Sequence, residues 1–419
     1  MKIGIVGGGA SGIMAAVTAS DFGAEVIVLE KNDRVGKKIL ATGNGKCNFS
    51  NRNLAKDDYN SQYPDIFDNF ISQFNEKQVL SFFQAEGMLI KEKNGYFYPR
   101  SEQASTILDL FRVKLQDHGV KIITDCCPCR IKAGKDKEGK EGFVVSLEEK
   151  KRLFFDRLIL ACGSFAGERS PDWEGKNGYQ YARAFGHTIV PVVPALVQLR
   201  AGDRRFKAIA GVRCEAGITL YIDGKQRAQE QGELQLTDYG ISGIPVFQLS
   251  RFASYGFLEK KEVSVSIDFL PEFEREQWKG FVESKWENCN HEITTEEFFL
   301  GFLNKKLNLL FIKEAKLKPE AFIKDYGREQ VVKACMRMKD WKVRLESSNP
   351  LANAQVCAGG VSMEEISLHM ESKKQKGLFF AGEMLDVDGR CGGYNLQWAW
   401  TSGYLAGKYA AQGGTTAEE

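Results

Sequence analysis

The chain of 419 residues is too long for one ordinary domain and long enough for two or three, each with its own core. Its 57 lysines and arginines almost balance 55 acidic residues, so charge indicates no nucleic-acid, membrane or acidic partner. No apolar run reaches the roughly 18 residues of a membrane span. The ten cysteines are too scattered for a disulfide framework, so we expect a soluble, cytoplasmic protein with reduced thiols.

The first 30 residues have the pattern of strand, glycine turn, helix and strand. KIGIV at 2–6 predicts a buried parallel strand, GGGASG at 7–12 opens a helix, and GAEVIVLE at 23–30 predicts a second strand. A secretory signal peptide is a poor alternative, because glycines interrupt the apolar stretch.

This pattern predicts dinucleotide binding. Gly7 permits the tight turn, and Gly9 lets the backbone approach a pyrophosphate at the positive end of the helix. Glu30 lies 18 residues after Gly12, where a carboxylate can accept both ribose hydroxyls. The same carboxylate would repel the 2′-phosphate of NADP.

Hydrophobic spacing predicts the next elements: a helix at 67–86, a hairpin edge at 95–99, a helix at 105–119, and strands at 120–124, 143–148 and 156–163. Cys126 to Cys129 contain a CxxC motif, but no helix start follows it and no second ligand pair has zinc spacing. We interpret it as a structural strand end.

Two later segments favour FAD over NAD as the dinucleotide. LILACGSFAG at 158–167 is an apolar strand that breaks into small residues, so its backbone can pass close to a cofactor. GLFFAGEMLD at 377–386 predicts a strand ending in Ala-Gly-Glu, and a helix at 397–411 follows. In flavoproteins of this architecture, the late strand meets the ribityl chain and the helix dipole stabilises negative charge on the reduced ring. NAD dehydrogenases need no such second element.

The middle of the chain differs in character. It is rich in β pattern from 191 to 270 and helical from 271 to 345, so the FAD-binding domain is expected at 1–190 and 346–419. We expect the two joins to lie close together and the insert to cover the flavin ring. The alternative is a dimerisation module that packs far from the flavin.

Several motifs resemble the YhiN-like and BaiN-like bacterial flavoproteins, a family of NAD(P)/FAD-dependent, aminoacetone oxidase-like oxidoreductases. They are GKKILATGNGKCNFSN at 36–51, GELQLTDYGISG at 232–243, CAGGV at 357–361 and AGEMLDVDGRCGGYNLQWAWTSG at 381–403. The resemblance implies an α/β fold with a two-part, glutathione-reductase-like Rossmann domain, and a flavin beside the 42–48 loop. Thr42, Lys46, Cys162 and Ser164 depart from the family pattern, and lysine for arginine at 46 replaces a bidentate fork with a point charge.

These arguments and the resemblance together give a set of candidate cofactor-binding residues: Gly7, Gly9, Ala10, Ser11, Gly12, Glu30, Lys31, Lys37, Thr42, Gly43, Gly45, Cys47, Asn48, Ala161, Cys162, Gly163, Gly382, Glu383, Asp386, Gly393, Tyr394 and Asn395. No metal site and no catalytic residue are assigned.

Three of these side chains and two further lysines leave alternatives open. Lys37, Lys38 and Lys46 can offset pyrophosphate charge or be solvated, and for Lys38 the solvated interpretation is favoured. Cys47 is interpreted as a packing or cofactor contact rather than a redox thiolate, because it lacks a CxxC partner. Tyr394 can deliver a proton or cover the ring.

The favoured function is an FAD enzyme that passes hydride between a reduced nicotinamide and a small organic substrate. The resemblance suggests an unsaturated ketone of steroid type. With one GxGxxG motif in the chain, NADH or NADPH is expected to bind only transiently. The alternatives are an FAD-dependent RNA-modifying enzyme, which the neutral charge disfavours, and a flavin-bound protein without turnover. Oligomeric state is left open.

Overall fold

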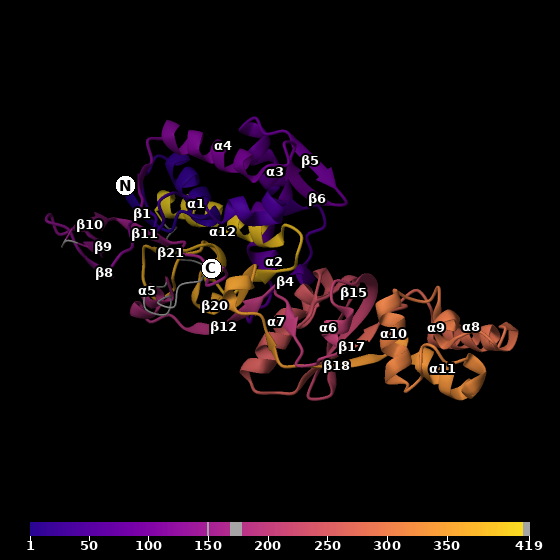
Figure 1. Ribbon diagram of the computed structural model, residues 1–419. Helices are drawn as coiled ribbons and strands as arrows, with labels where there is room; N and C mark the ends of the chain where they lie inside the picture. The colour runs from indigo at the N-terminus through magenta and orange to yellow at the C-terminus, as the bar shows by residue number, and fades with distance from the viewer. Residues whose placement is uncertain (149–150, 168–177, 414–419) are drawn as a thin grey trace. The chain divides into compact units, whose positions relative to one another are not determined.

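The computed structural model describes residues 1–148, 151–167 and 178–413, and it divides into two compact units (Figure 1). Unit 1 comprises residues 1–192 and 356–419, and unit 2 comprises 193–355. The buried apolar residues form two separate clusters, one within each unit. Each unit therefore has its own core.

Unit 1 is built on a five-stranded parallel sheet with the strand order β21-β11-β1-β2-β7. The strands are β1 (Lys2–Val6), β2 (Glu25–Leu29), β7 (Lys121–Ile123), β11 (Arg157–Leu160) and β21 (Leu378–Phe380). β1, β11 and β21 are almost wholly buried, as expected for strands covered on both faces. This confirms the α/β class and the Rossmann-type domain.

Helices from both ends of the chain pack together in unit 1, where α1 and α12 lie side by side (Figure 1). The helices of this unit are α1 (Ala10–Asp21), α2 (Ile66–Asn69), α3 (Glu76–Ala85), α4 (Ala104–Asp117), α5 (Gly178–Ala184) and α12 (Tyr394–Gln412). Its short 3₁₀ helices are η1 (Ile39–Gly45), η2 (Lys56–Asp58), η3 (Ile71–Phe74), η9 (Met363–Glu365) and η10 (Gly382–Met384).

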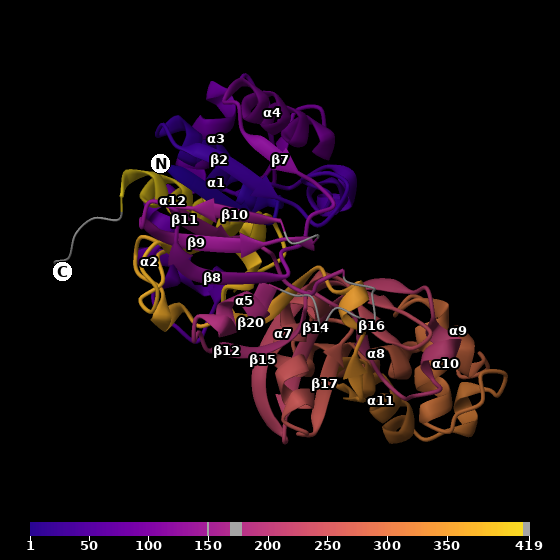
Figure 2. The same ribbon diagram turned by 90° about the vertical axis from the view of Figure 1, so that its left-hand side faces the viewer.

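Small antiparallel sheets complete unit 1. The layer β10-β9-β8 (Arg152–Phe155, Glu141–Ser146, Arg130–Lys135) is seen in Figure 2. The others are β3-β6-β5 (Ser50–Asn51, Tyr96–Pro99, Ile90–Lys93) and β22-β4 (Asp388–Gly389, Tyr59–Asn60). Cys126 to Cys129 link β7 to β8 without a helix start, in agreement with the strand-end interpretation.

Unit 2 has a seven-stranded antiparallel sheet with the order β18-β17-β14-β15-β16-β13-β19. Its strands are β13 (Leu199–Arg200), β14 (Arg213–Ile222), β15 (Lys225–Leu236), β16 (Gly240–Ser242), β17 (Val263–Asp268), β18 (Trp341–Leu345) and β19 (Ser347–Ser348). Its helices are α6 (Phe206–Ile209), α7 (Ile244–Leu258), α8 (Arg275–Asn288), α9 (Thr295–Phe299), α10 (Lys305–Glu314) and α11 (Arg328–Met336), with η6 (Ile323–Asp325), η7 (Arg337–Lys339) and η8 (Leu351–Asn353).

The chain passes between the units by two strands that form their own two-stranded sheet, β12 (Ile189–Ala195) and β20 (Val356–Val361). Gly359 has φ +86°, and a Cβ there would come within 2.2 Å of the Pro191 carbonyl oxygen. The two joins therefore run side by side. Among the described residues, no helix has the length and apolar character needed to cross a membrane.

Candidate cofactor-binding site

The carboxyl ends of four parallel strands place most of the candidate residues at one edge of the sheet. Gly7 N–H donates to the Leu29 carbonyl at 2.8 Å, Ala161 N–H to Val6 at 2.9 Å, and Ala381 N–H to Leu160 at 2.9 Å. Because the strands are parallel, the segments that follow β1, β2, β11 and β21 meet at this edge. This is where ligands bind in open α/β sheets.

The glycine turn after β1 is shaped by close backbone contacts. Gly7 has φ +108°, and a Cβ there would lie 2.3 Å from the Ala161 carbonyl oxygen. At Gly12 a Cβ would lie 1.9 Å from the Gly7 carbonyl oxygen, so helix α1 can approach the turn only without a side chain. At Gly9 a Cβ would meet nothing within 4 Å. Gly7 and Gly12 are thus required for close packing, whereas Gly9 leaves open space at the start of the helix.

Glu30 is a buried carboxylate directed at this turn. It is 6% exposed, and its Oε2 accepts from Gly8 N–H at 2.7 Å while its Oε1 accepts from Asn32 N–H at 2.8 Å. Asn32 Nδ2 also donates to Oε1, so three bonds fix the carboxylate and leave it one further acceptor position for the ribose. Gly8 and Asn32 were not among the candidates. Gly8 donates through its backbone, and a Cβ there would lie 2.5 Å from Val35 Cγ1, so the glycine itself was a signal, as was the position of Asn32 two residues after the acid.

The N-terminus of α1 is an uncapped helix end beside this turn. Gly9 is its N-cap, no side chain caps the helix, and no acidic residue lies in the first turn, where Ala10 and Ser11 stand. Uncapped N–H groups and the positive helix end favour an anion. With the open space at Gly9 and the buried Glu30, the residues fit the adenosine diphosphate half of FAD.

The loop at 36–48 is joined to the same turn, since Gly36 N–H donates to the Gly8 carbonyl at 2.7 Å. Within it, Gly43 and Gly45 have φ values of +55° and +83°, and Thr42 Oγ1 donates to the Ile39 carbonyl at 2.6 Å. The positive φ values explain why a glycine-rich sequence is needed here. Asn48 follows, and with its amide oriented to suit its neighbours its nitrogen donates to the Phe97 and Ser50 carbonyls.

Lysines around the loop have acidic partners. Lys37 Nζ lies 2.7 Å from Asp33, and Lys38 Nζ lies 2.6 Å from Glu383 Oε2, which also accepts from Ser164 Oγ at 3.0 Å. Lys38 is exposed, and its half-exposed side chain bridges the loop to the segment after β21. Lys31 lies on the exposed surface just after Glu30.

Two thiols lie at this edge, Cys47 buried and Cys162 partly buried. Burial raises the pKa of the Cys47 thiol to about 12 and that of the Cys162 thiol to about 12. Cys47 has φ +54° and no exposed surface, and Cys162 Sγ lies 3.5 Å from the Val6 carbonyl oxygen. A neutral buried thiol is a packing group and a poor nucleophile. Next to Cys162, Gly163 has φ +72° and open space at its Cβ position.

The start of α12 forms the second half of the site. The helix begins at Tyr394, three residues before the expected start, and Gly393 is its N-cap with φ +96°. A Cβ at Gly393 would come within 2.6 Å of the Ser50 carbonyl oxygen. As at α1, no side chain caps the helix and its first turn holds no acid, so this end also favours negative charge.

Tyr394, Asn395 and Asp386 are engaged in the loop that leads to α12. Tyr394 Oη donates to the Asn53 carbonyl at 3.0 Å, and burial raises the pKa of this phenol to about 12. Asn395 Nδ2 donates to the Gly389 carbonyl at 2.8 Å, and buried Asp386 accepts from Gln62 N–H at 2.9 Å. These contacts favour a structural role for Tyr394 over proton delivery.

The packing of α12 on α1 was missed from the sequence. A Cβ on Gly403 would lie 2.4 Å from the Ser11 carbonyl oxygen, and one on Gly407 would lie 2.5 Å from that of Ala15. Gly382, with φ +77°, would likewise bring a Cβ to 2.3 Å from Ser11 Oγ. The glycines four residues apart on α12 were the available signal.

Comparisons with known proteins extend over both units. The HI0933-like protein Rossmann domain family matches residues 1–409. A 3-dehydro-bile acid delta(4,6)-reductase from Clostridium scindens is 42% identical over 98% of this chain and 99% of its own. A ribosomal RNA dihydrouridine synthase from Haemophilus influenzae is 29% identical over 96% of each chain. Among solved structures, a 3-ketosteroid-delta4-(5alpha)-dehydrogenase from Rhodococcus jostii is 14% identical, with a TM-score of 0.46 over 98% of this chain and 96% of that chain.

Proposed function

We propose that this chain, which belongs to the HI0933-like Rossmann-domain family and is an FAD-dependent oxidoreductase, reduces a carbon–carbon double bond conjugated to a ketone in a steroid-type substrate. The observation that carries the proposal is its near-full-length similarity to the bile-acid reductase. The name of that relative describes reduction of delta(4,6) double bonds in a 3-dehydro-bile acid, which is a ketone of this type.

The residues of the site support the proposal through what they can bind. FAD, when bound, supplies a carrier that takes up hydride and passes it to a polarised double bond. Glu30 offers its remaining acceptor position to a ribose hydroxyl, and the turn at 7–12 offers N–H groups to the diphosphate. The uncapped N-terminus of α12 favours negative charge beside it. The candidate cofactor residues remain a proposal that binding experiments must test.

We propose a reduced nicotinamide, NADH or NADPH, as the hydride donor. The chain has one dinucleotide turn, which is assigned to FAD, so the nicotinamide would bind transiently and leave after the flavin is reduced. The ten free thiols are compatible with work in a reducing cytoplasm.

The second candidate function is reduction of uridine in ribosomal RNA, and the similarity to the dihydrouridine synthase favours it. Both reactions add hydrogen across a double bond conjugated to a carbonyl group. The formal net charge of +2 speaks against extended contact with RNA phosphates, and the identity to the bile-acid reductase is higher. The steroid-type substrate is therefore preferred.

The test is anaerobic flavin spectroscopy of the purified protein. We expect the denatured protein to release FAD. In the native protein, NADH or NADPH should bleach the flavin absorbance stoichiometrically, and a 3-oxo-4,6-diene steroid acid should then restore it. Release of FMN alone would contradict the cofactor. If the ketone leaves the flavin reduced while unmodified ribosomal RNA reoxidises it, the RNA function replaces the proposed one. If neither substrate reoxidises it, the protein does not turn over either class.

A further inference from the structure

Glu383, in the segment after β21, is bound by side chains from two other loops of unit 1. Its Oε2 lies 2.6 Å from Lys38 Nζ and accepts from Ser164 Oγ at 3.0 Å. Lys38 belongs to the loop at 36–48, and Ser164 belongs to the segment after β11. One largely buried carboxylate therefore joins three loops at the carboxyl edge of the parallel sheet, and its partner Lys38 lies 345 residues away in the sequence.

The strand order shows what this ion pair spans. The loop that carries Lys38 is tied to the turn after β1, because Gly36 N–H donates to the Gly8 carbonyl at 2.7 Å. In the sheet, β11 separates β1 from β21, so the strands at the two ends of the pair are two spacings, or about 10 Å, apart. The Lys38–Glu383 pair therefore crosses the end of β11, between the glycine turn and the segment that leads to α12.

The backbone is fixed at both ends of the pair, whereas the lysine side chain is not. Gly382, which precedes Glu383, donates from its N–H to Ser402 Oγ at 2.9 Å, so α12 holds this end. Lys38 precedes Ile39, whose side chain is buried in the core of unit 1. The Lys38 side chain is half-exposed and has a flexible four-carbon stem. The pair can therefore open by rotation of one side chain, without movement of the backbone.

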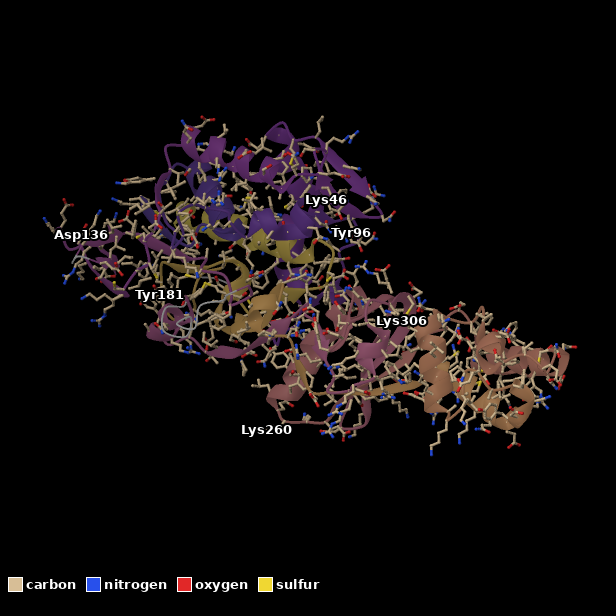
Figure 3. All side chains as sticks on the ribbon, viewed as in Figure 1. Lys46, Tyr96, Asp136, Tyr181, Lys260 and Lys306 are labelled. Carbon is tan, nitrogen blue, oxygen red and sulfur yellow. The ribbon has the colours of Figure 1, made fainter. Side chains whose placement is uncertain are left out.

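The other two lysines of this loop pair elsewhere. Lys37 Nζ lies 2.7 Å from Asp33, four residues before it, and Lys46, labelled in Figure 3, lies 3.6 Å from Glu102. Neither pair reaches the segments that follow β11 and β21. Of the three lysines, all in the described part of the chain, Lys38 is the one whose ion pair crosses the edge of the sheet.

We propose that the Lys38–Glu383 pair is a strap that FAD must pass to enter or leave its site. A dinucleotide held by Glu30, the glycine turn and the N-terminus of α12 extends over the interval that the pair bridges. The closed pair blocks entry and exit alike. Rotation of an exposed side chain is far faster than release of a tightly held cofactor, so both rates follow the fraction of time for which the pair is open. The strap depends on FAD lying at this edge and not on the identity of the substrate.

Lys38→Met tests the strap, because it removes the charge and keeps most of the length of the side chain. The rate of FAD release is measured as the rise in flavin fluorescence after dilution of the holoprotein, and the affinity by titration of the apoprotein with FAD. Because an ion pair with one exposed partner is weak, we expect Lys38→Met to release FAD about fivefold faster. The dissociation constant should stay unchanged, since entry is faster by the same factor. Lys38→Arg keeps the pair and should release FAD at the wild-type rate.

Lys140→Met is the matched control. Lys140 Nζ lies 2.5 Å from Asp156, a largely buried carboxylate that also accepts from Lys2 N–H at 2.7 Å. Asp156 precedes β11, so this pair lies at the opposite end of the sheet, and its loss should change neither the release rate nor the affinity. Salt gives a second check, because screening acts within roughly 3 Å at 1 M ionic strength. Wild-type release in such salt should approach that of Lys38→Met.

Three results would overturn the strap. If Lys38→Met speeds release and weakens affinity by the same factor, Lys38 holds FAD directly and does not control its passage. If Lys38→Met and the wild type release FAD equally fast, the pair is a surface contact without effect on exchange. If Lys140→Met speeds release as much as Lys38→Met does, the cause is the stability of unit 1. None of these measurements uses a substrate, so failure of the proposed reaction on a steroid-type ketone leaves the test of the strap intact.

Discussion

Glu30 owes its role to its place at the end of a buried strand. A carboxylate that is 6% exposed needs hydrogen-bond donors, and it finds them in the backbone of Gly8 and Asn32. The sequence predicted the acid and its spacing from the glycine turn. It did not predict these donors, because backbone N–H groups are the same in every residue except proline.

We predict that Glu30→Arg weakens FAD binding by well over tenfold without unfolding unit 2. The substitution replaces the carboxylate that would accept from the ribose with a cation. It also leaves the N–H groups of Gly8 and Asn32 without their acceptor. Titration of the apoprotein with FAD, followed by flavin fluorescence, measures the affinity. Glu25→Arg, at the exposed start of the same strand, is the control and should retain wild-type affinity. Equal affinities would mean that the ribose is held elsewhere.

His187 is a buried histidine in unit 1, between β12 and the segment after β20. Its Nδ1 lies 2.9 Å from Glu365 Oε2, and its Nε2 lies 2.7 Å from Ser372 Oγ. Burial lowers the pKa of the imidazole, while bonds from Lys374 and Thr188 outweigh the effect of burial on Glu365 and lower the pKa of its carboxyl to about 2. The folded state thus holds neutral His187 beside ionised Glu365.

This network predicts that stability falls in acid. For His187, the lowered pKa means that stability is complete above the usual histidine pKa near 6.5 and declines as pH falls below it. For Glu365, stability is complete above 4.5 and is lost as pH falls toward 2. Urea midpoints measured from pH 7 down to 3 should therefore decrease, and Glu365→Gln should flatten the decrease below pH 4.5. Glu364→Gln, at the exposed neighbouring position, should not flatten it.

At the scale of elements, buried strands were predictable and breaks in helices were not. The apolar runs at 2–6 and 23–30 became β1 and β2, because an uninterrupted apolar run suits a strand covered on both faces. The helix expected at 67–86 is three pieces. Phe70 has a non-helical backbone between α2 and η3, and Asn75 is extended, with a side chain that accepts from Lys77 N–H to start α3. A local hydrophobic spacing does not reveal such a cap in the middle of a helical pattern.

The insert shows the same limit. The range 191–270, expected to be β-rich, also contains α7, and the end of the expected helical range is strand β18. In β18 alternate residues are buried, and the strand pairs with β17 from Val263 to Ile267. The segment at 341–345 is a strand because it pairs with β17, about 75 residues earlier in the chain. The five residues of β18 alone do not reveal such a distant partner. The domain boundaries drawn from the sequence stay a prediction.

The contact of α1 with α12 is tested by Gly403→Val. The valine would meet the Ser11 carbonyl oxygen, where even a Cβ lies only 2.4 Å away, so α12 must move and its N-terminus with it. We expect a loss of about 1–3 kcal/mol of stability, typical of overpacking, and release of flavin at lower temperature in a thermal shift assay. Gly280→Ala is the control, because a Cβ there meets nothing within 4 Å, and it should leave flavin release unchanged. Retention of wild-type flavin release in Gly403→Val would contradict the tight packing.

At the scale of the whole molecule, an insertion with its own core can be removed without opening the core of its host. The unit 1 cluster draws on segments before and after the insertion, and the unit 2 cluster draws on the insertion alone. The chain leaves and returns through neighbouring strands, β12 and β20, so a short linker can join the two halves of unit 1. This arrangement makes the proposed role of the insert open to experiment.

The last prediction is that the insert acts as the substrate gate. Replacing residues 192–348 with a glycine-serine linker should leave a protein that can bind FAD, because the candidate cofactor residues all lie in unit 1. Substrate-selecting segments commonly exclude water and oxygen from a reactive centre. We therefore expect the shortened protein to consume oxygen unselectively with a reduced nicotinamide and to lose turnover of the native substrate. If it folds, keeps its flavin and reduces that substrate at near the wild-type rate, the insert is instead a module for association, and sedimentation of the two proteins should then differ in oligomeric state.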